Sequence, residues 1–235
     1  MPFGVEQIES WPAFKKRVGD SYTQQELATR KAVSFRGHAD RNWALEPTLV
    51  RAMRNSIGSN AWPHTGTVLP ELIEDFKQNC YGIRASIEHP TEEAEWEFLG
   101  RHHGLPTRIL DWSSSPYVAA FFALADKSSA AYACVWVLSH RDVKWAKAGL
   151  EIKEFGDTTR FNVRAVEQRG VSMRCLEPEL PIEISLENHL IRLDLNRNMR
   201  EAALVDLDEM LINHRTLCRD LDGAARLSTI RFQLD

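Results

Sequence analysis

Cysteine is scarce in this sequence, and its placement predicts neither a metal centre nor a disulfide framework. The 235 residues contain four cysteines, far apart and without a CxxC pair: Cys80, Cys134, Cys175 and Cys218. Three of them lie in apolar segments, as is typical of buried, reduced thiols. The chain also lacks the H-E-x-x-H and H-x-x-x-H spacings of metal sites, so we expect no metal cofactor.

A leader-like start and long apolar runs are missing as well. The opening MPFGVEQIESWPAF has no basic stretch followed by an apolar one, and no run approaches the ~20 apolar residues that span a bilayer. The sequence therefore predicts a cytoplasmic protein with no membrane partner. A net charge of −4 argues against nucleic-acid binding by bulk charge, but 29 lysines and arginines are enough for a local basic groove.

Neither an internal repeat nor a low-complexity linker interrupts the chain, and strand and helix patterns both occur. The sequence predicts an α+β fold, a mixed β-sheet core with flanking helices. We expect an N-terminal helical segment over residues 1–32 and one α+β domain over residues 33–235.

The expected elements follow from periodicity and end signals. Strands are expected at residues 31–37 and 131–139 and once or twice within 182–195, and a loop at 56–70. Helices are expected from Pro70 past Cys80, from Thr91 to Gly104, after Ser115-Pro116, and within 199–214. DLDG at residues 220–223 predicts a turn in which glycine takes positive φ.

The stretch HHGLPTRILDWSSSP, residues 102–116, places many polar groups beside an apolar helix. One interpretation is structural, because a buried Arg108 needs a carboxylate and Asp111 lies three residues away. The other is functional: the turn lines a cleft in which Ser113 and Ser114 meet an anion at a helix N-terminus. Ser115 is better explained as the helix cap.

Four segments resemble the FRG domain family, which is named for a Phe-Arg-Gly signature. The matching residues are Phe35-Arg36-Gly37 with Trp43, Leu45, Pro47 and Arg51; Gly104 to Pro116; Arg164, Gln168 and Gly170; and Asp220 to Gly223. The resemblance spans about residues 33 to 225. The sequence departs from the family pattern in two places: Arg101 replaces a glutamine, and Cys218-Arg219 replaces Phe-Pro.

The order of these parts is similar to that of arginine-type ADP-ribosyltransferases, in which an arginine, a serine-rich turn and a Gln/Glu pair follow one another. The resemblance implies that NAD is bound as a substrate and that no metal is needed. The residues it implies for NAD binding are Arg36, Gly37, His102, Arg108, Ser113 and Ser114, and those for catalysis are Glu167 and Gln168. Asp111 is a rival carboxylate.

The chemistry of this reaction suits these residue types. A guanidinium binds phosphate oxygens in bidentate fashion, and a carboxylate stabilises the positive charge that develops on the ribose as nicotinamide leaves. Gly37, which has no side chain, would let a ligand approach the backbone beside Arg36. Trp112 or Tyr117 could stack on nicotinamide or on a target base.

Two functions stay open at this point. The first is an NAD-using ADP-ribosyltransferase-like enzyme, an intracellular toxin or antiphage effector that modifies nucleic acid or protein and is neutralised by an antitoxin or regulatory protein. The alternative is a non-enzymatic module in which Arg36, Arg51, Arg108 and Arg164 bind a phosphate, nucleotide or nucleic-acid end. A purely structural role would leave these arginines in salt bridges.

Overall fold

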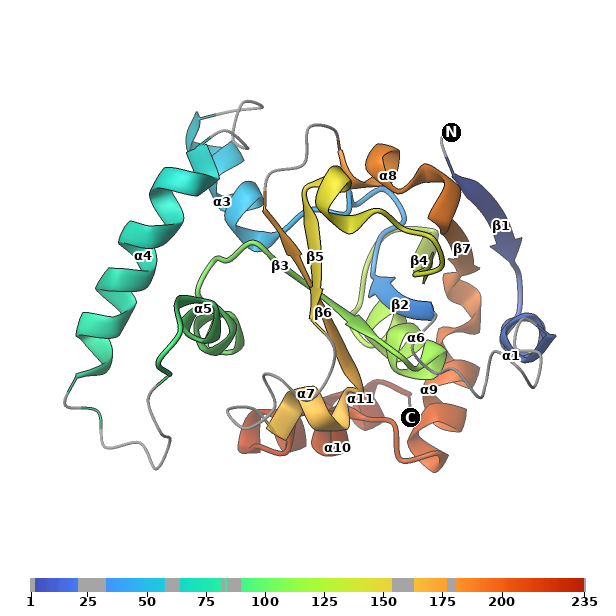
Figure 1. Ribbon diagram of the computed structural model, residues 1–235. Helices are drawn as coiled ribbons and strands as arrows, with labels where there is room; N and C mark the ends of the chain where they lie inside the picture. Colours follow the sequence, from blue (N-terminus) through green and yellow to red (C-terminus); the bar gives the residue numbers. More distant parts are fainter. Residues whose placement is uncertain are drawn as a thin grey trace.

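A computed structural model gives the arrangement of the chain (Figure 1). The structure describes residues 3–20, 33–57, 64–81, 83, 90–153, 163–176 and 181–234. Its strands are β1 (Gly4–Ile8), β2 (Val33–His38), β3 (Ile109–Ser113), β4 (Tyr132–Ser139), β5 (Leu150–Lys153), β6 (Gly170–Cys175) and β7 (Leu190–Asn196). Its helices are α1 (Trp11–Asp20), α3 (Thr48–Ile57), α4 (Thr65–Cys80), α5 (Glu93–His102), α6 (Pro116–Leu124), α7 (Val163–Glu167), α8 (Ile182–Ser185), α9 (Arg200–Glu209), α10 (His214–Cys218) and α11 (Leu221–Leu234).

The seven strands form one mixed sheet in the order β1-β7-β4-β2-β3-β6-β5. The β1–β7 pair is parallel and the other pairs are antiparallel. The expected α+β fold with a mixed sheet is therefore confirmed.

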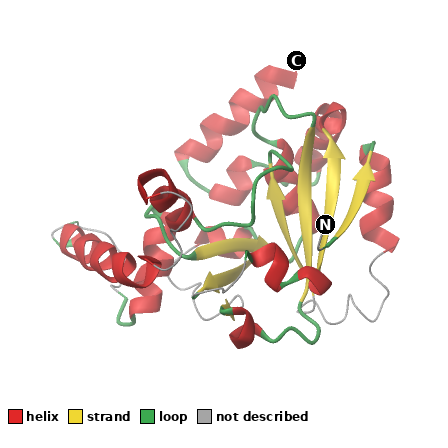
Figure 2. Ribbon diagram, turned by 90° about the horizontal axis from the view of Figure 1, so that it is seen from above, coloured by secondary structure: helices red, strands yellow, loops and turns green. Residues whose placement is uncertain are grey.

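The sheet is nearly divided between β2 and β3. These two strands share a single residue pair, Phe35 with Ser113, whereas β2 pairs with β4 along its whole length and β3 does so with β6. The strands accordingly fall into two groups that run at a steep angle to each other, as the yellow arrows of Figure 2 show. The junction leaves backbone groups of β3 that β2 does not pair, and this is where the arginine of the FRG signature lies.

Helices cover the sheet unevenly. Helices α1, α6 and α9 enclose the largest apolar cluster with one face of β2, β4 and β7, and the opposite face carries a second cluster that includes Trp136 and Leu110. Helices α3, α4 and α5 form a third cluster, on the side of the molecule away from β1 (Figure 1).

Several expected boundaries are confirmed by the structure. Ser115 caps α6 through its hydroxyl, which accepts a hydrogen bond from the Val118 amide, and Pro116 occupies the first turn. The strand expected at residues 131–139 is β4, and the strand expected at 31–37 is β2.

Other expectations were wrong. The opening residues form strand β1 before helix α1 begins. Of the one or two strands expected within 182–195 the structure has one, β7, and Ile182–Ser185 is a short helix. Helix α4 begins at Thr65, inside the stretch expected to be a loop, and continues through Pro70. Helix α5 is capped by Glu92 in a capping box with Glu95, one residue after the expected Thr91.

Candidate functional site

Arg36 lies at the junction between the two halves of the sheet. Its side chain leaves β2 and donates from Nη1 to the backbone carbonyl of Asp111 on β3. A side chain thus makes a hydrogen bond that a continuous sheet would make through its backbone. Burial lowers the pKa of Arg36 to about 10, so the guanidinium stays charged at neutral pH.

His38 fixes the orientation of Arg36. Arg36 donates from Nε to His38 Nε2 (3.1 Å), and a guanidinium only donates, so Nε2 must be the accepting nitrogen of a neutral imidazole. The other ring nitrogen, Nδ1, then donates to the carbonyl of Trp43 (3.3 Å). Burial and the charge of Arg36 lower the pKa of His38 to about 3, which keeps the ring neutral.

Two more arginines act on this guanidinium. Arg101 on α5 and Arg51 on α3 both lower the pKa of Arg36 by repulsion, and Asp111 opposes them. The Asp111 carboxylate pairs with Arg101 (2.8 Å). Among the described residues no ion pair joins Arg51 to a carboxylate, although Arg51 is near enough to Glu46, the partner of Arg54, to oppose the burial that raises the pKa of Glu46. Arg36, Arg51 and Arg101 thus bring three positive charges near Asp111, the carboxylate that pairs with Arg101.

The Arg108–Asp111 pair expected from the sequence is wrong. Successive strand residues face opposite sides of a sheet, so positions three apart cannot share a face. Arg108 instead lies 3.7 Å from the carboxylate of Glu97, which also accepts a hydrogen bond from the Arg108 amide (3.0 Å). Glu97 is buried and pairs with Arg174 of β6 as well (3.1 Å).

The segment around Trp43 and Pro47 is fastened to the turn before β3. The amide of Thr107 donates to the hydroxyl of Thr48 (3.1 Å), and the amide of Leu49 donates to the carbonyl of Thr107 (3.1 Å). These bonds join segments that are 59 residues apart in the sequence. They hold the start of α3, and hence Arg51, beside the strand that carries Asp111.

The serine turn is joined to the Glu167-Gln168 segment. Ser113 donates from its hydroxyl to the carbonyl of Gln168 (2.7 Å), and the amide of Ser114 donates to the carbonyl of Arg169 (2.9 Å). The Ser113 hydroxyl also accepts from the amide of Ser115 (3.0 Å), so its donor and acceptor roles are both used within the protein. Arg36 on β2, the serine turn at the end of β3 and the Glu167-Gln168 segment before β6 therefore belong to neighbouring parts of the sheet.

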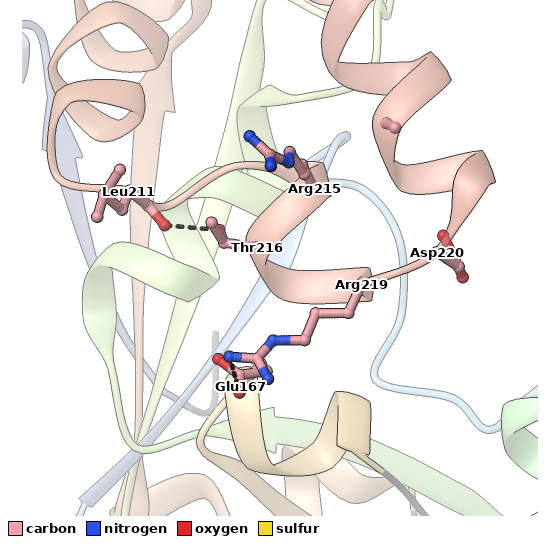
Figure 3. Close-up of a pocket in the computed structure, with 7 residues that line it drawn as sticks. Glu167, Leu211, Arg215, Thr216, Arg219 and Asp220 are labelled. Carbon is pink, nitrogen blue, oxygen red and sulfur yellow. Dashed lines mark hydrogen bonds and ion pairs between the residues drawn. The ribbon is translucent and has the colours of Figure 1, made fainter.

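The side chains of Glu167 and Gln168 point toward α10. Glu167 pairs with Arg219 (2.8 Å), and the Gln168 amide donates to the carbonyl of Leu217 (3.2 Å). Glu167 lines an open cavity of about 700 Å³ on this side of the molecule (Figure 3). The other residues lining it are Leu211, Arg215, Thr216, Arg219, Asp220 and Ala224. Both predicted catalytic side chains are thus engaged by the C-terminal helices and not by the groups around Arg36.

Two glycines of the signature segments have packing roles. A Cβ at Gly37 would lie 2.0 Å from the carbonyl oxygen of Ala119, so the missing side chain admits helix α6 and not a ligand, contrary to our expectation. Gly223 lies inside α11 without positive φ, also contrary to expectation, and a Cβ there would meet the carbonyl of His214 at 2.6 Å. Asp220 does accept the Gly223 amide, as a cap of that helix (2.6 Å).

The remaining predicted residues are placed as follows. His102 is half-buried at the end of α5. Trp112 is 2% exposed in the core and Tyr117 packs edge-on against Trp11, so neither is available to stack on a ligand. The side chain of Arg164 lies outside the described residues.

Three residues of the site were missed in the sequence. Glu97 stands between Trp96 and Phe98 in an apolar helix, and a carboxylate in such a run signals a buried partner. Arg101 was noted only as a departure from the family pattern, and its partner, Asp111, lies on another element. Trp43 was named only as part of the FRG resemblance, because its exposure depends on the loop that carries it.

Comparison with family models matches residues 31–131 to the FRG domain. No match was found among curated proteins or among solved structures. Within the described residues, no helix is long and apolar enough to cross a membrane. The same residues contain no group of three histidine, cysteine, aspartate or glutamate side chains that could hold a metal ion.

Proposed function

We propose that this chain, whose residues 31–131 match the FRG domain, is an ADP-ribosyltransferase-like enzyme that binds NAD through Arg36. The observation that supports the proposal best is the positive charge gathered at Arg36, Arg51 and Arg101 at the junction of the sheet. A dinucleotide carries two phosphate charges, which this positive charge would attract. A buried guanidinium held by His38 and a backbone carbonyl is oriented before the ligand arrives.

The arrangement of strands supports the same proposal. Arg36 on β2, the serine turn at the end of β3 and the Glu167-Gln168 segment before β6 occupy consecutive strands of the sheet. They keep the order arginine, serines, Gln/Glu that resembles ADP-ribosyltransferases. A pyrophosphate at Arg36 would bring the adjoining ribose toward the serine turn.

Two carboxylates compete for the catalytic role. Asp111 is next to Arg36 and 38% exposed, whereas Glu167 is paired with Arg219 on the far side of the serine turn. Asp111 can stabilise positive charge on the ribose without a change of partner at α10, so the geometry favours it. Measuring nicotinamide release and NAD affinity in Asp111→Asn and Glu167→Gln distinguishes the two. The variant that lacks the catalytic carboxylate should lose turnover and keep its affinity for NAD.

The test of NAD binding is titration calorimetry of wild type, Arg36→Ala and Arg36→Lys. Loss of a charge-assisted contact should weaken binding by about 1.5–3 kcal/mol, roughly ten- to a hundredfold. Lysine should recover part of the lost affinity, because it keeps the positive charge but lacks the bidentate geometry of the guanidinium. Circular dichroism checks folding, and equal affinity in all three proteins would remove Arg36 from the site.

The engagement of Glu167 and Gln168 by α10 favours a second candidate, the non-enzymatic phosphate- or nucleotide-binding module. Wild-type protein that binds nucleotides but releases no nicotinamide from NAD would support it. If nicotinamide is released, incubation with labelled NAD and either nucleic acid or protein extract would identify the acceptor, and hence whether the chain acts as a toxin or antiviral effector.

A further inference from the structure

Trp43 is an exposed aromatic residue with no packing role that explains it. Its side chain is 49% exposed, whereas Leu45, two residues later, is 2% exposed. Every other described tryptophan is partly or fully buried, with exposures of 8% or less at Trp11, Trp96, Trp112 and Trp136. One exposed apolar side chain is ordinary on a protein surface, so Trp43 matters for its place beside the arginine cluster.

The position of Trp43 links it to the arginine cluster. Its backbone carbonyl accepts the hydrogen bond from His38, and its ring centroid lies 6.1 Å from that of His38 at an interplanar angle of 55°. His38 in turn accepts from Arg36 at 3.1 Å. The imidazole of His38 therefore lies between the guanidinium of Arg36 and the exposed indole of Trp43.

We infer that Trp43 is the platform on which the base of a phosphate-bearing ligand stacks while Arg36 holds its phosphate. The inference rests on the proposed nucleotide site and specifies it: the ligand carries a planar heterocycle, which in NAD is either adenine or nicotinamide. Stacking on an aromatic face does not depend on hydrogen-bonding pattern, so both rings fit the platform. Trp112 and Tyr117 are excluded from this role by burial and packing.

Two hydrogen bonds of His38 and one of the Trp43 amide give the platform its rigidity. Arg36, His38 and the Trp43 carbonyl form one chain of hydrogen bonds, and the amide of Trp43 donates to the carbonyl of Asp40 (3.1 Å). A ring on a fixed backbone loses little freedom when a base stacks on it. Removing the indole should therefore affect base-bearing ligands and leave the phosphate contact intact.

The experiment compares wild type with Trp43→Ala, Trp43→Phe and Arg36→Ala in the full chain, using titration calorimetry. Phe232→Ala is the matched control, because Phe232 is 81% exposed on α11, outside the site. The ligands are NAD, ADP, nicotinamide mononucleotide and inorganic pyrophosphate. Trp43→Ala should weaken NAD roughly ten- to a hundredfold and leave pyrophosphate unchanged, and phenylalanine should recover most of the loss.

The outcomes separate this inference from the proposed function. A loss for ADP but not for the mononucleotide assigns adenine to Trp43, the reverse assigns nicotinamide, and either supports the platform. Unchanged NAD affinity in Trp43→Ala, with weakened binding in Arg36→Ala, overturns the platform and leaves the phosphate site. If NAD binding depends on Trp43 but no nicotinamide is released, the proposed enzyme activity is rejected and the stacking role of Trp43 stands. Wild type that binds none of the base-bearing ligands overturns both.

Discussion

At the scale of single residues, Glu97 is the charged group that joins helix α5 to the sheet. It is 1% exposed and accepts hydrogen bonds from the Arg108 amide and from Arg174 Nε (3.1 Å). Arg174 also pairs with Glu151 of β5 (2.7 Å). One buried carboxylate thus ties the helix that carries Arg101 to strands β3 and β6, and so helps to hold Arg101 against Asp111.

We predict that Glu97→Ala lowers the free energy of unfolding by about 3–5 kcal/mol, because it leaves two arginines without their buried partner. Glu151→Ala is the control: it removes a partner of the same Arg174, but one whose side chain is 34% exposed, and should cost about 1 kcal/mol or less. Urea denaturation measures both. Similar unfolding midpoints for the two variants would mean that burial does not distinguish these contacts.

At the scale of elements, the sequence predicted the helices and strands whose ends depend on contacts between nearby residues. Helix α6 begins at Ser115-Pro116 because the Ser115 hydroxyl bonds an amide only three residues further on, and β4 follows from its own apolar pattern. Both predictions are confirmed. Strand β1 is at the edge of the sheet and exists through its pairing with β7, nearly 190 residues away along the chain, which no local pattern reports.

The candidate site could also be predicted only in part. That Arg36 lies beside β3, and Ser113 beside the Gln168 segment, could be predicted because these segments carry polar signatures between apolar flanks. The partners within it could not. Which carboxylate meets Arg108 depends on strand faces and on a helix that the sequence does not place, and the gap between β2 and β3 depends on the pairing of the whole sheet.

The contact between β2 and α6 gives the prediction at this scale. At Gly37 a methyl group would collide with the backbone of Ala119 and Ala123, at 2.0 and 2.7 Å, and backbone cannot swing aside as a flexible side chain can. Gly37→Ala should therefore destabilise the protein by several kcal/mol, more than the usual 1–3 kcal/mol cost of overpacking. Thermal melting followed by circular dichroism tests this.

Gly19→Ala is the matched control for that substitution. Gly19 lies in α1, and nothing lies within 4 Å of the position that an added methyl group would take, so alanine should be neutral or stabilise the helix by about 0.5–1 kcal/mol. Equal melting temperatures for Gly37→Ala and wild type would require α6 to shift away from β2 at no cost.

At the scale of the whole molecule, the FRG match is smaller than the structural unit. Residues 31–131 contain β2 and β3 but end one residue before β4, which pairs with β2 from Val33 to His38. They also exclude β6, the partner of every residue in β3. The arginine site therefore needs strands outside the matched segment to hold its own strands in place.

The N-terminal residues are part of that unit as well. All five residues of β1 pair with β7, and Trp11, Phe14 and Val18 of α1 are buried in the cluster with α6 and α9. Trp11 and Lys15 both contact Asp206 of α9 through their side-chain nitrogens. Burial of three large apolar side chains contributes roughly 1.5–3 kcal/mol each, which is comparable to the whole stability of a typical domain.

We therefore predict that a chain starting at residue 33 does not show the cooperative thermal transition of the full chain. The shortened chain would lose cooperativity because β1 no longer pairs with the edge of β7 and α1 no longer covers its face of α6. The control is Lys15→Ala in the full chain, which removes one surface ion pair with Asp206, 40% exposed on the lysine side, and should cost about 1 kcal/mol or less. Circular dichroism melts of the three proteins make the comparison. If the shortened chain melts as the full chain does, residues 1–32 are a separable segment, and β1 and α1 add nothing to the stability of the sheet.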